Sequence, residues 1–299
     1  MPELPDVDLY LHALTPRIVG QRLEAVRFAS PFLLRSIDPP LSEVTGRVVR
    51  DLRRLGKRIV WRLDDDVFVV IHLMIAGRFR WKDRGAAVPG KVGLAAFDFP
   101  NGTLLLTEAG SKRQASLYFV RGLAGLSVHD PGGVEPLEMS REEFARALQR
   151  ENHTIKRALT DPHIFSGIGN AYSDEILHAA GISPMKQTAQ LSEGEIERLH
   201  GATVDTLTAW RQRLIEETGD RFPEKVTAFR DGMAVHGRYG KPCPVCGSPV
   251  QRIRYAANEA NYCPTCQTGG KLLADRSLSR LLKGDWPRSL EELEKRMGR

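Results

Sequence analysis

The sequence predicts an α+β multidomain protein, with an N-terminal β-sandwich and flanking helices followed by an α-helical region that leads into a cysteine-rich finger. Three observations support this prediction. Short runs of alternating apolar and polar residues fill positions 22–121. Helix-capping signals replace them from residue 139 to about residue 220. All four cysteines of the 299-residue chain then lie within positions 243–266.

The β-rich region follows one short helix, which is expected from about Pro5 to Leu14. Turn signals such as Pro100-Asn101-Gly102 separate the strand-like runs. Many short strands at this spacing are typical of a β-sandwich or barrel. The runs with the clearest alternation are Ile59–Trp61, Val67–Leu73, Arg78–Trp81, Ala95–Phe99 and Leu104–Thr107.

Helical signals begin after the turn at residues 130–133. Capping boxes, in which a serine precedes a glutamate by three positions, are expected to begin helices, and a glycine is placed to end another. The same capping pattern returns near the C-terminus, where it predicts a short helix. These signals are Ser140 with Glu143, Gly181, Ser192 with Glu195, and Ser289 with Glu292.

The changes of pattern divide the chain into four parts. Residues 1–130 are expected to form the β-sandwich domain, and residues 139–222 the helical domain. Residues 223–268 contain a basic loop and the cysteines, and residues 269–299 form a tail. Apolar residues make up 41% of the chain, which is enough for each of two domains to bury a core.

Composition restricts the environment and the partners. Lys and Arg exceed Asp and Glu by 43 to 37, and the resulting net charge of +6 suits a polyanionic partner but is also ordinary for a soluble protein. The N-terminus is acidic where a secretory signal would be basic, and no apolar run approaches the roughly 18 residues of a membrane span. We therefore expect a cytoplasmic protein that does not engage a membrane.

The cysteines form two C-x2-C pairs, Cys243 with Cys246 and Cys263 with Cys266. This spacing is typical of a tetrahedral zinc site with thiolate ligands, and two disulfides are the alternative that an intracellular protein disfavours. Four thiolates leave zinc no open position, so one structural zinc ion is expected. Such fingers occur in several classes of nucleic-acid-binding protein, and the cluster therefore indicates nucleic acid without naming a reaction.

The N-terminal residues suggest covalent chemistry. Removal of Met1 would expose the secondary amine of Pro2, and α-amino groups titrate near about 7.7 to 8.0, so part of it is unprotonated at neutral pH. Its attack on a sugar C1′ gives an iminium that acidifies the C2′ protons and permits β-elimination. Glu3 is placed to move protons. The alternative is that Pro5 and Asp6 merely begin a helix.

Three motifs together resemble one family. PELPDVDLY at residues 2–10, FSGIGNAYSDEILHAAGISP at residues 165–184 and the four-cysteine finger are similar, in the same order, to motifs of the formamidopyrimidine-DNA glycosylase and endonuclease VIII family. The resemblance runs from Pro2 to Cys266. It implies a DNA-repair enzyme with a β-sandwich that bears the catalytic N-terminus, a helix-two-turn-helix domain with the zinc finger, and DNA bound between them.

The resemblance implies roles for three residues of the first domain. Pro2 matches the Schiff-base nucleophile of the family and Glu3 its general acid. Lys57 matches a lysine that acts at the lesion by contacting a phosphate beside it. Taken without the resemblance, Lys57 would be a solvated lysine in a turn.

Other matches concern residues that are expected to contact DNA. Asn170 matches an asparagine that binds phosphate, and the glycine-rich turn before it would expose N–H groups at a helix start, although a plain turn between helices is the alternative. Met74 and Ile75 align with the segment that fills the space left by a flipped base, with core packing as the alternative.

Two loops depart from the family pattern. Asn258 stands where the family usually has an arginine that grips phosphates, and an amide lacks the charge and the five donors of a guanidinium. Lys112 and Arg113 lie where relatives carry an Arg-Arg-Phe wedge, but no aromatic residue follows them. We expect all three residues to lie at the DNA, with an altered recognition of the lesion.

The resemblance therefore predicts a bifunctional glycosylase and abasic-site lyase. Its partner would be double-stranded DNA with oxidised or ring-opened bases or abasic sites, bound by a monomer in a bacterial-type cytoplasm at the nucleoid. The alternative is a non-catalytic protein that binds damaged DNA on the same scaffold, because Asn258 and the missing aromatic residue alter the recognition loops. A zinc-ribbon accessory factor would explain the cysteines but not residues 165–184. The preferred lesion, the base opposite and the extent of elimination stay open.

Overall fold

The computed structural model of the chain describes residues 1–110, 112–255, 258–274 and 287–297. They form two compact units. The first unit comprises Met1–Gly132 with Ala209–Ala228, and the second comprises Gly133–Thr208 with Phe229–Arg299. Helix α7, Glu193–Thr218, begins in the second unit and ends in the first.

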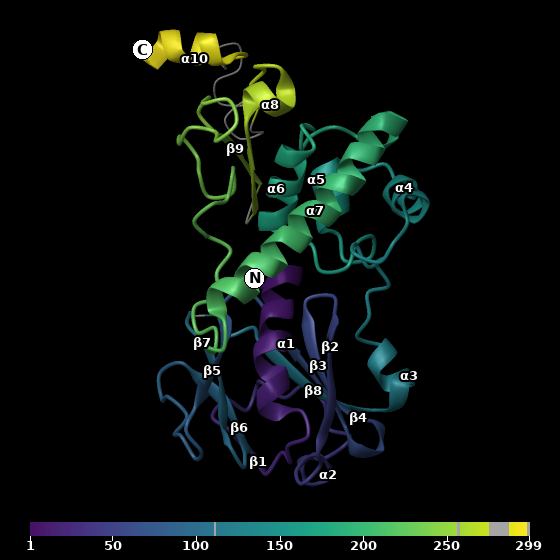
Figure 1. Cartoon of the computed structure of the whole chain (residues 1–299), viewed down its shortest axis with the longest axis vertical. Helices are drawn as coiled ribbons and strands as arrows, with labels where there is room; N and C mark the ends of the chain where they lie inside the picture. Colours follow the sequence, from purple (N-terminus) through teal and green to yellow (C-terminus); the bar gives the residue numbers. More distant parts are fainter. Residues whose placement is uncertain (111, 256–257, 275–286, 298–299) are drawn as a thin grey trace. The chain divides into compact units, whose positions relative to one another are not determined.

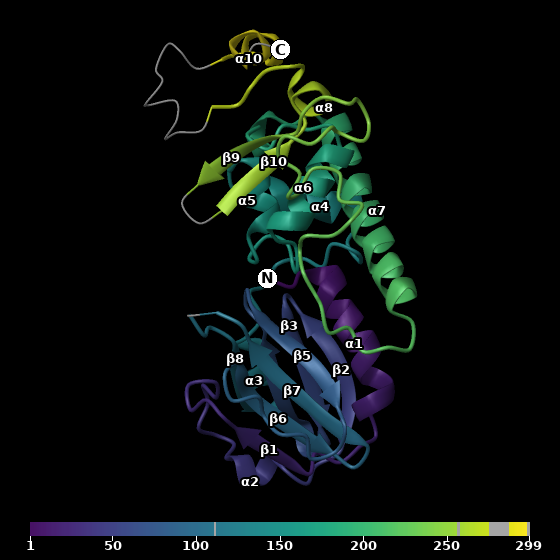
Figure 2. The same cartoon turned by 90° about the vertical axis from the view of Figure 1, so that its left-hand side faces the viewer.

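Eight strands build the first unit, namely β1 (Ala25–Phe28), β2 (Val49–Leu55), β3 (Arg58–Leu63), β4 (Val67–His72), β5 (Gly77–Lys82), β6 (Gly93–Phe99), β7 (Gly102–Glu108) and β8 (Ser116–Arg121). They form two antiparallel sheets with the orders β2-β3-β4-β8 and β1-β6-β7-β5 (Figures 1 and 2). Trp61 of one sheet meets Phe97 of the other edge to face, with ring centroids 5.0 Å apart. The predicted β-sandwich is confirmed, since the two sheets share this aromatic core.

Helix α1, Leu4–Ile18, packs against β2 and β3 and is longer than predicted. The expected end at Leu14 was wrong, because the helix continues through Pro16 to Ile18. The side chains of Thr15 and Arg17 donate to the carbonyl oxygens of Leu11 and Ala13, which stabilises the last turn around the proline. Three short helical segments complete the unit: α2 (Leu41–Val44), η1 (Asp64–Asp66) and α3 (Gly122–Ser127).

The second unit begins with helices whose predicted caps are confirmed. Ser140 and Glu143 form a reciprocal capping box, and Gly181 takes the left-handed conformation after the helix that ends at Ala179. Phe144 and Phe165 pack in the core with ring centroids 4.9 Å apart. None of the described helices is long and apolar enough to cross a membrane. Besides α7, the helices here are α4 (Arg141–Gln149), α5 (Ile155–Thr160), α6 (Asn170–Ala179) and η2 (Thr188–Gln190).

The finger belongs to the same unit. Strands β9 (Gln251–Tyr255) and β10 (Asn258–Tyr262) form an antiparallel hairpin, and the short helix α8 (Pro264–Thr268) follows. Helix α6 packs against both β10 and α8, so the finger shares its core with the helical region. The capping serine predicted near the C-terminus is confirmed, because Ser289 accepts the N–H of Glu292 at the start of α10 (Leu290–Met297).

Candidate active site and metal centre

The start of helix α1 holds the predicted catalytic residues in a buried place. Pro2 is buried, and Glu3 is 3% exposed. Asp6 accepts the backbone N–H of Glu3 at 2.9 Å, which fixes the chain just after Pro2. The carboxylate of Asp6 thus satisfies a donor at the start of the helix, and its charge is favourable at the positive end of the helix dipole.

The terminal amine of this chain is surrounded by charged groups. Burial lowers the pKa of the Met1 amine below its ordinary value of 8.0; Glu3 and Asp6 oppose the shift, whereas Arg78 and Lys57 act in the same direction. A lowered pKa increases the share of neutral amine at a given pH, and only a neutral amine can attack an electrophilic carbon.

Lys57 lies in the tight turn between β2 and β3, after Gly56, whose φ of 60° suits glycine. Burial lowers the pKa of Lys57, and the nearby Glu3 carboxylate opposes this shift. The structure thus brings Lys57, Glu3 and the terminal amine into one cluster, although they are distant in sequence.

His72 completes this cluster and was missed by the sequence analysis. It lies at the end of β4, opposite Arg58 on β3 and Ser116 on β8. Burial, assisted by Arg58, Lys57 and the terminal amine, lowers the pKa of His72 to about 4. Its Nε2 is buried and has no hydrogen-bond partner among the described residues. Its position at the end of an apolar strand was the available signal, but period-2 alternation alone gives such a residue no function.

The segment after His72 forms a tight, unusual turn. Met74 is half-buried with a positive φ of 53°, and Ile75 is 62% exposed. A Cβ on Gly77 would lie 2.2 Å from the carbonyl oxygen of Leu73, so only glycine fits there. Arg78 donates to the carbonyl oxygens of Gly77 and Ile75 at 2.6 and 3.1 Å. The turn therefore presents Ile75 to solvent, and core packing does not account for it.

A second loop of the first unit presents two cations. Lys112 and Arg113 are exposed, and Arg113 donates to the carbonyl oxygen of Lys91 at 2.9 Å. Glu108 is 2% exposed, and its carboxylate accepts the N–H groups of Gln114 and Ala115 at 3.0 to 3.1 Å. These bonds anchor the end of the loop beside the two cations.

In the second unit, Asn170 is the first residue of α6, after a turn in which Gly167 has a positive φ of 77° and Gly169 is the N-cap. The helix start offers backbone N–H groups, as predicted for an anion site. Lys156 donates from Nζ to the carbonyl oxygen of Asn170 at 2.7 Å and to Oδ1 of Asp174 at 2.5 Å. The phosphate-binding role of Asn170 stays a prediction, but its backbone is held by a buried lysine.

Helix α6 is joined to the finger by buried carboxylates. Asp174 is fully buried and its Oδ2 also lies 2.8 Å from Nδ1 of His236 and 3.0 Å from Nδ2 of Asn261 on β10. Glu175 accepts the backbone N–H groups of residues 234–236 at 2.6 to 2.9 Å. Glu175 therefore anchors the segment before the finger.

The finger hairpin contains the remaining predicted residue. Asn258 is the first residue of β10 and pairs with Tyr255, but its side chain lies outside the described part of the chain. On β9, the guanidinium of Arg252 stacks 4.4 Å from the ring centroid of Tyr239 and lies 3.6 Å from Glu259.

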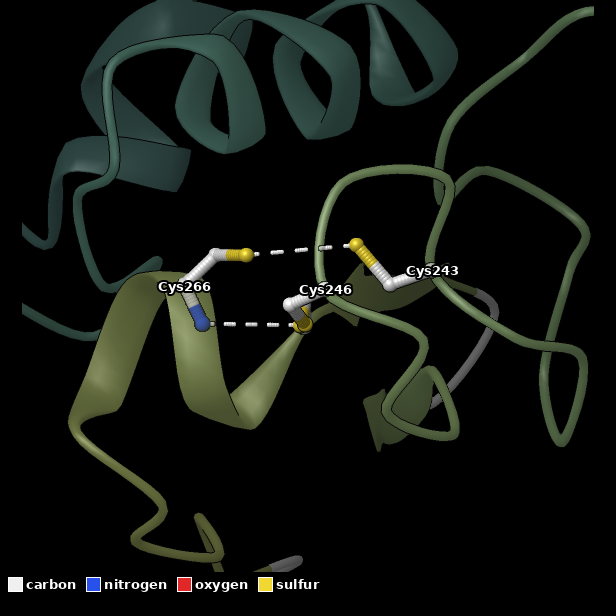
Figure 3. A group of neighbouring side chains, drawn as sticks. Cys243, Cys246 and Cys266 are labelled. Atoms are coloured by element: carbon white, nitrogen blue, oxygen red, sulfur yellow. Dashed lines mark hydrogen bonds between the residues drawn. The ribbon is translucent and has the colours of Figure 1, made fainter.

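The four cysteines converge as their spacing predicted. Their sulfur atoms all lie within 4.8 Å of one another, with 3.9 Å between Cys243 and Cys266 and 3.3 Å between Cys246 and Cys263. A tetrahedral zinc with bonds of about 2.3 Å requires sulfur atoms about 3.8 Å apart, so the residues fit one structural zinc ion. Figure 3 shows Cys243 and Cys246 in the loop before β9 and Cys266 on α8, with their side chains converging.

Three family profiles match this chain in succession. Residues 1–110 match the formamidopyrimidine-DNA glycosylase N-terminal domain, and residues 133–214 match the formamidopyrimidine-DNA glycosylase H2TH domain. Residues 240–269 match the zinc finger found in FPG and IleRS.

Curated relatives and solved structures agree with these profiles. A formamidopyrimidine-DNA glycosylase from Symbiobacterium thermophilum is 31% identical over 89% of either chain. An uncharacterized formamidopyrimidine-DNA glycosylase-like protein from Mycobacterium tuberculosis is 43% identical, over 50% of this chain and 94% of its own length. The Lactococcus lactis Fpg in complex with abasic-site DNA superimposes with a TM-score of 0.78 at 26% identity, covering 89% of this chain and 99% of the other.

Proposed function

Because the chain belongs to the formamidopyrimidine-DNA glycosylase family, we propose that it excises oxidised or ring-opened bases from DNA and cleaves the strand through the amine of Pro2. The buried Pro2, next to the buried Glu3 and with Lys57 near that carboxylate, carries this proposal. Its physical basis is that the Pro2 amine can act as the nucleophile while the adjacent Glu3 carries protons.

The reaction follows from these groups once Met1 is removed. The Pro2 nitrogen forms a bond to C1′ while the bond from C1′ to the base breaks, and the proton that the Pro2 nitrogen loses passes to the departing base. Glu3 supplies a proton to the sugar ring oxygen as the C1′–O4′ bond breaks, which leaves an iminium between the Pro2 nitrogen and C1′. The iminium withdraws electrons, so the Glu3 carboxylate takes a C2′ proton and the C3′–O bond breaks with departure of the phosphate. Water then hydrolyses the iminium and regenerates the amine.

Several groups would hold the nucleic acid. Lys57 supplies a cation, and the unpartnered Nε2 of His72 is a polar atom for a phosphate or sugar oxygen. The N–H groups at Asn170 would bind a second phosphate. The exposed Ile75, with Met74, would fill the space left by the flipped base. Lys112, Arg113 and Asn258 complete the predicted contacts.

The zinc ion would be structural rather than catalytic. When bound, it holds the two cysteine pairs together and leaves no coordination position for substrate. Among the described residues of the hairpin from Gln251 to Tyr262, strand β10 packs against α6, and the zinc ion would stabilise the finger in addition to this packing.

The proposed partner is double-stranded DNA with a damaged base or an abasic site. Structures similar to this chain include a Lactococcus lactis Fpg bound to DNA with an abasic site and another bound to DNA with an oxidised pyrimidine. We propose that the chain acts as a monomer on chromosomal DNA, in the bacterial cytoplasm and at the nucleoid. Binding should weaken steeply with salt if several phosphates are held.

The decisive experiment is to trap the iminium with borohydride on abasic-site DNA and to locate the bond by digestion and mass spectrometry. We expect the adduct on residue 2 of a chain that lacks Met1. Lys57 is the rival nucleophile within the cluster, because burial also lowers its pKa. An adduct on Lys57, or strand cleavage by a chain that retains Met1, would contradict the proposal.

The non-catalytic alternative rests on Asn258 and on the exposed Gln114, which follows Lys112 and Arg113 where the resemblance places an aromatic residue in relatives. It predicts lesion binding without cleavage. Nicking by the purified protein that is lost in Glu3→Gln would exclude it. A panel of oligonucleotides, each with one lesion, would then identify the preferred substrate.

A further inference from the structure

The metal centre has a side-chain neighbour that is not a cysteine. His178 lies in the last turn of α6 and is 8% exposed, and its Nε2 is 3.3 Å from Sγ of Cys243. It is not one of the four residues whose ligand atoms converge, so its geometry is that of a hydrogen bond to a ligand rather than of a ligand. Zinc-bound cysteine is a thiolate without a proton, and in this pair the imidazole must donate.

The charge of the site gives this bond a function. One zinc ion with four thiolates carries two net negative charges, and burying that charge is costly unless donors face the sulfur atoms. The backbone N–H of Cys266 is 3.5 Å from Sγ of Cys263, which is a long contact. His178 provides a shorter contact to a different sulfur, on a ligand that is 3% exposed.

A second contact ties the same part of α6 to the finger. Gln267 on α8 is 7% exposed, accepts the N–H of Cys263 at 2.8 Å and donates to the carbonyl oxygen of Ile182 at 2.9 Å. Ile182 follows the end of α6, so both cysteine pairs are linked to this helix end, one through His178 and one through Gln267.

We propose that His178 is a positioning residue for the zinc centre, which donates from Nε2 to Cys243 and thereby raises zinc affinity and couples zinc binding to the stability of helix α6. The same helix begins at Asn170, so the metal stabilises from one end a helix whose other end is the predicted anion site. This inference needs the zinc site but not the proposed glycosylase reaction.

The first test measures zinc affinity of the full chain by chelator competition. His178→Phe fills the space without a donor and is expected to bind zinc about 10- to 100-fold more weakly, as for other outer-shell partners of metal ligands. His178→Gln places an amide N–H near the position of Nε2 and should retain most of the affinity. His200→Gln is the matched control, because His200 lies on α7 and contacts the carbonyl oxygen of Met139. Equal affinity in His178→Phe and the parent chain would overturn the proposal.

Cobalt substitution distinguishes a positioning residue from a ligand. The parent chain and His178→Phe should both show the spectrum of four thiolates, with the sulfur-to-cobalt band displaced in the variant because Cys243 has lost a donor. A spectrum of three thiolates and one nitrogen in the parent chain would make His178 a ligand and refute the proposed role.

Hydrogen exchange tests the coupling to α6. Zinc should slow amide exchange over residues 174–180 in the parent chain and in His178→Gln, and should do so less in His178→Phe. Equal protection in both variants would assign the coupling to packing and Gln267 instead. The readouts are metal affinity, spectra and exchange, so a failure of the glycosylase proposal would leave them unaffected.

Discussion

The two units differ in how many hydrogen-bond partners surround their buried titratable groups. In the first, burial and nearby cations, among them Lys57, lower the pKa of the terminal amine and of His72, and Nε2 of His72 has no partner among the described residues. In the second, Asp174 contacts Lys156, His236 and Asn261.

This difference distinguishes a candidate reaction site in the first unit from a hydrogen-bond network that stabilises the second unit. A cluster of titratable groups with shifted pKa values is typical of functional sites, because its members can change protonation or receive a ligand. A buried charge surrounded by hydrogen bonds keeps one state and specifies one arrangement of the chain. We therefore expect substitutions in the first unit to change reaction and pH dependence, and substitutions around Asp174 to change stability.

The largest effect is expected from blocking the amine. A short extension before Pro2 converts the secondary amine into an amide nitrogen, which is not nucleophilic, and should reduce borohydride trapping on the order of 10³-fold or more. The same extension placed after Arg299 is the control and should have no effect. Full trapping by the N-terminally extended chain would show that the N-terminal amine is not the nucleophile.

Removing the charge of Asp174 should instead destabilise the second unit. Asp174→Asn leaves the buried Lys156 without its anionic partner and is expected to lower the free energy of unfolding by about 3 to 5 kcal/mol. Urea-induced unfolding measures this change. Glu142→Gln removes an exposed partner of Arg141 and should leave the midpoint unchanged. A comparable effect of the two substitutions would contradict the structural role of Asp174.

His72 should make stability depend on pH. Its pKa is about 4 in the folded chain and about 6.5 when unfolded, so the unfolded chain binds more protons between these values. The stabilisation is present above pH 6.5 and is lost as pH falls toward 4, which amounts to about 2 kcal/mol between pH 7 and pH 5. Urea unfolding at the two pH values should show this loss in the parent chain and a smaller loss in His72→Gln. The exposed His12→Gln should behave like the parent.

The smallest expected effect is a displaced pH profile. Arg78 and Lys57 lower the pKa of the Met1 amine, with Arg78 the stronger of the two, and we expect the same of the Pro2 amine once Met1 is removed. Arg78→Gln should therefore move the rise of adduct formation to higher pH, and Lys57→Gln should move it less. Arg80→Gln, an exposed change on the same strand, is the control. A shift toward lower pH in Arg78→Gln would mean that the cluster is not electrostatically coupled as described.

Much of the architecture could be predicted because its signals are local. Capping boxes, the glycine after α6 and the C-x2-C pairs each act within a few residues, and the structure contains all of them. Strand β2 is different, because its sequence VRDLRRL has no clear alternation. It forms a strand by pairing with β3, from Leu55↔Arg58 at the turn to Val49↔Leu63, so the cross-strand partner rather than its own alternation makes it a strand.

The fold class, the family resemblance and the metal ligands could be predicted from the amino-acid sequence alone, because periodicity, caps and short motifs depend on neighbouring residues. Which distant residues share a buried environment becomes known only from the folded structure. Examples are His72 beside the terminal amine, Asp174 beside Asn261, and His178 beside Cys243. The reason is physical: pKa values and the cost of a buried polar atom depend on every group within a few ångströms, and chain folding brings those groups together from separate segments.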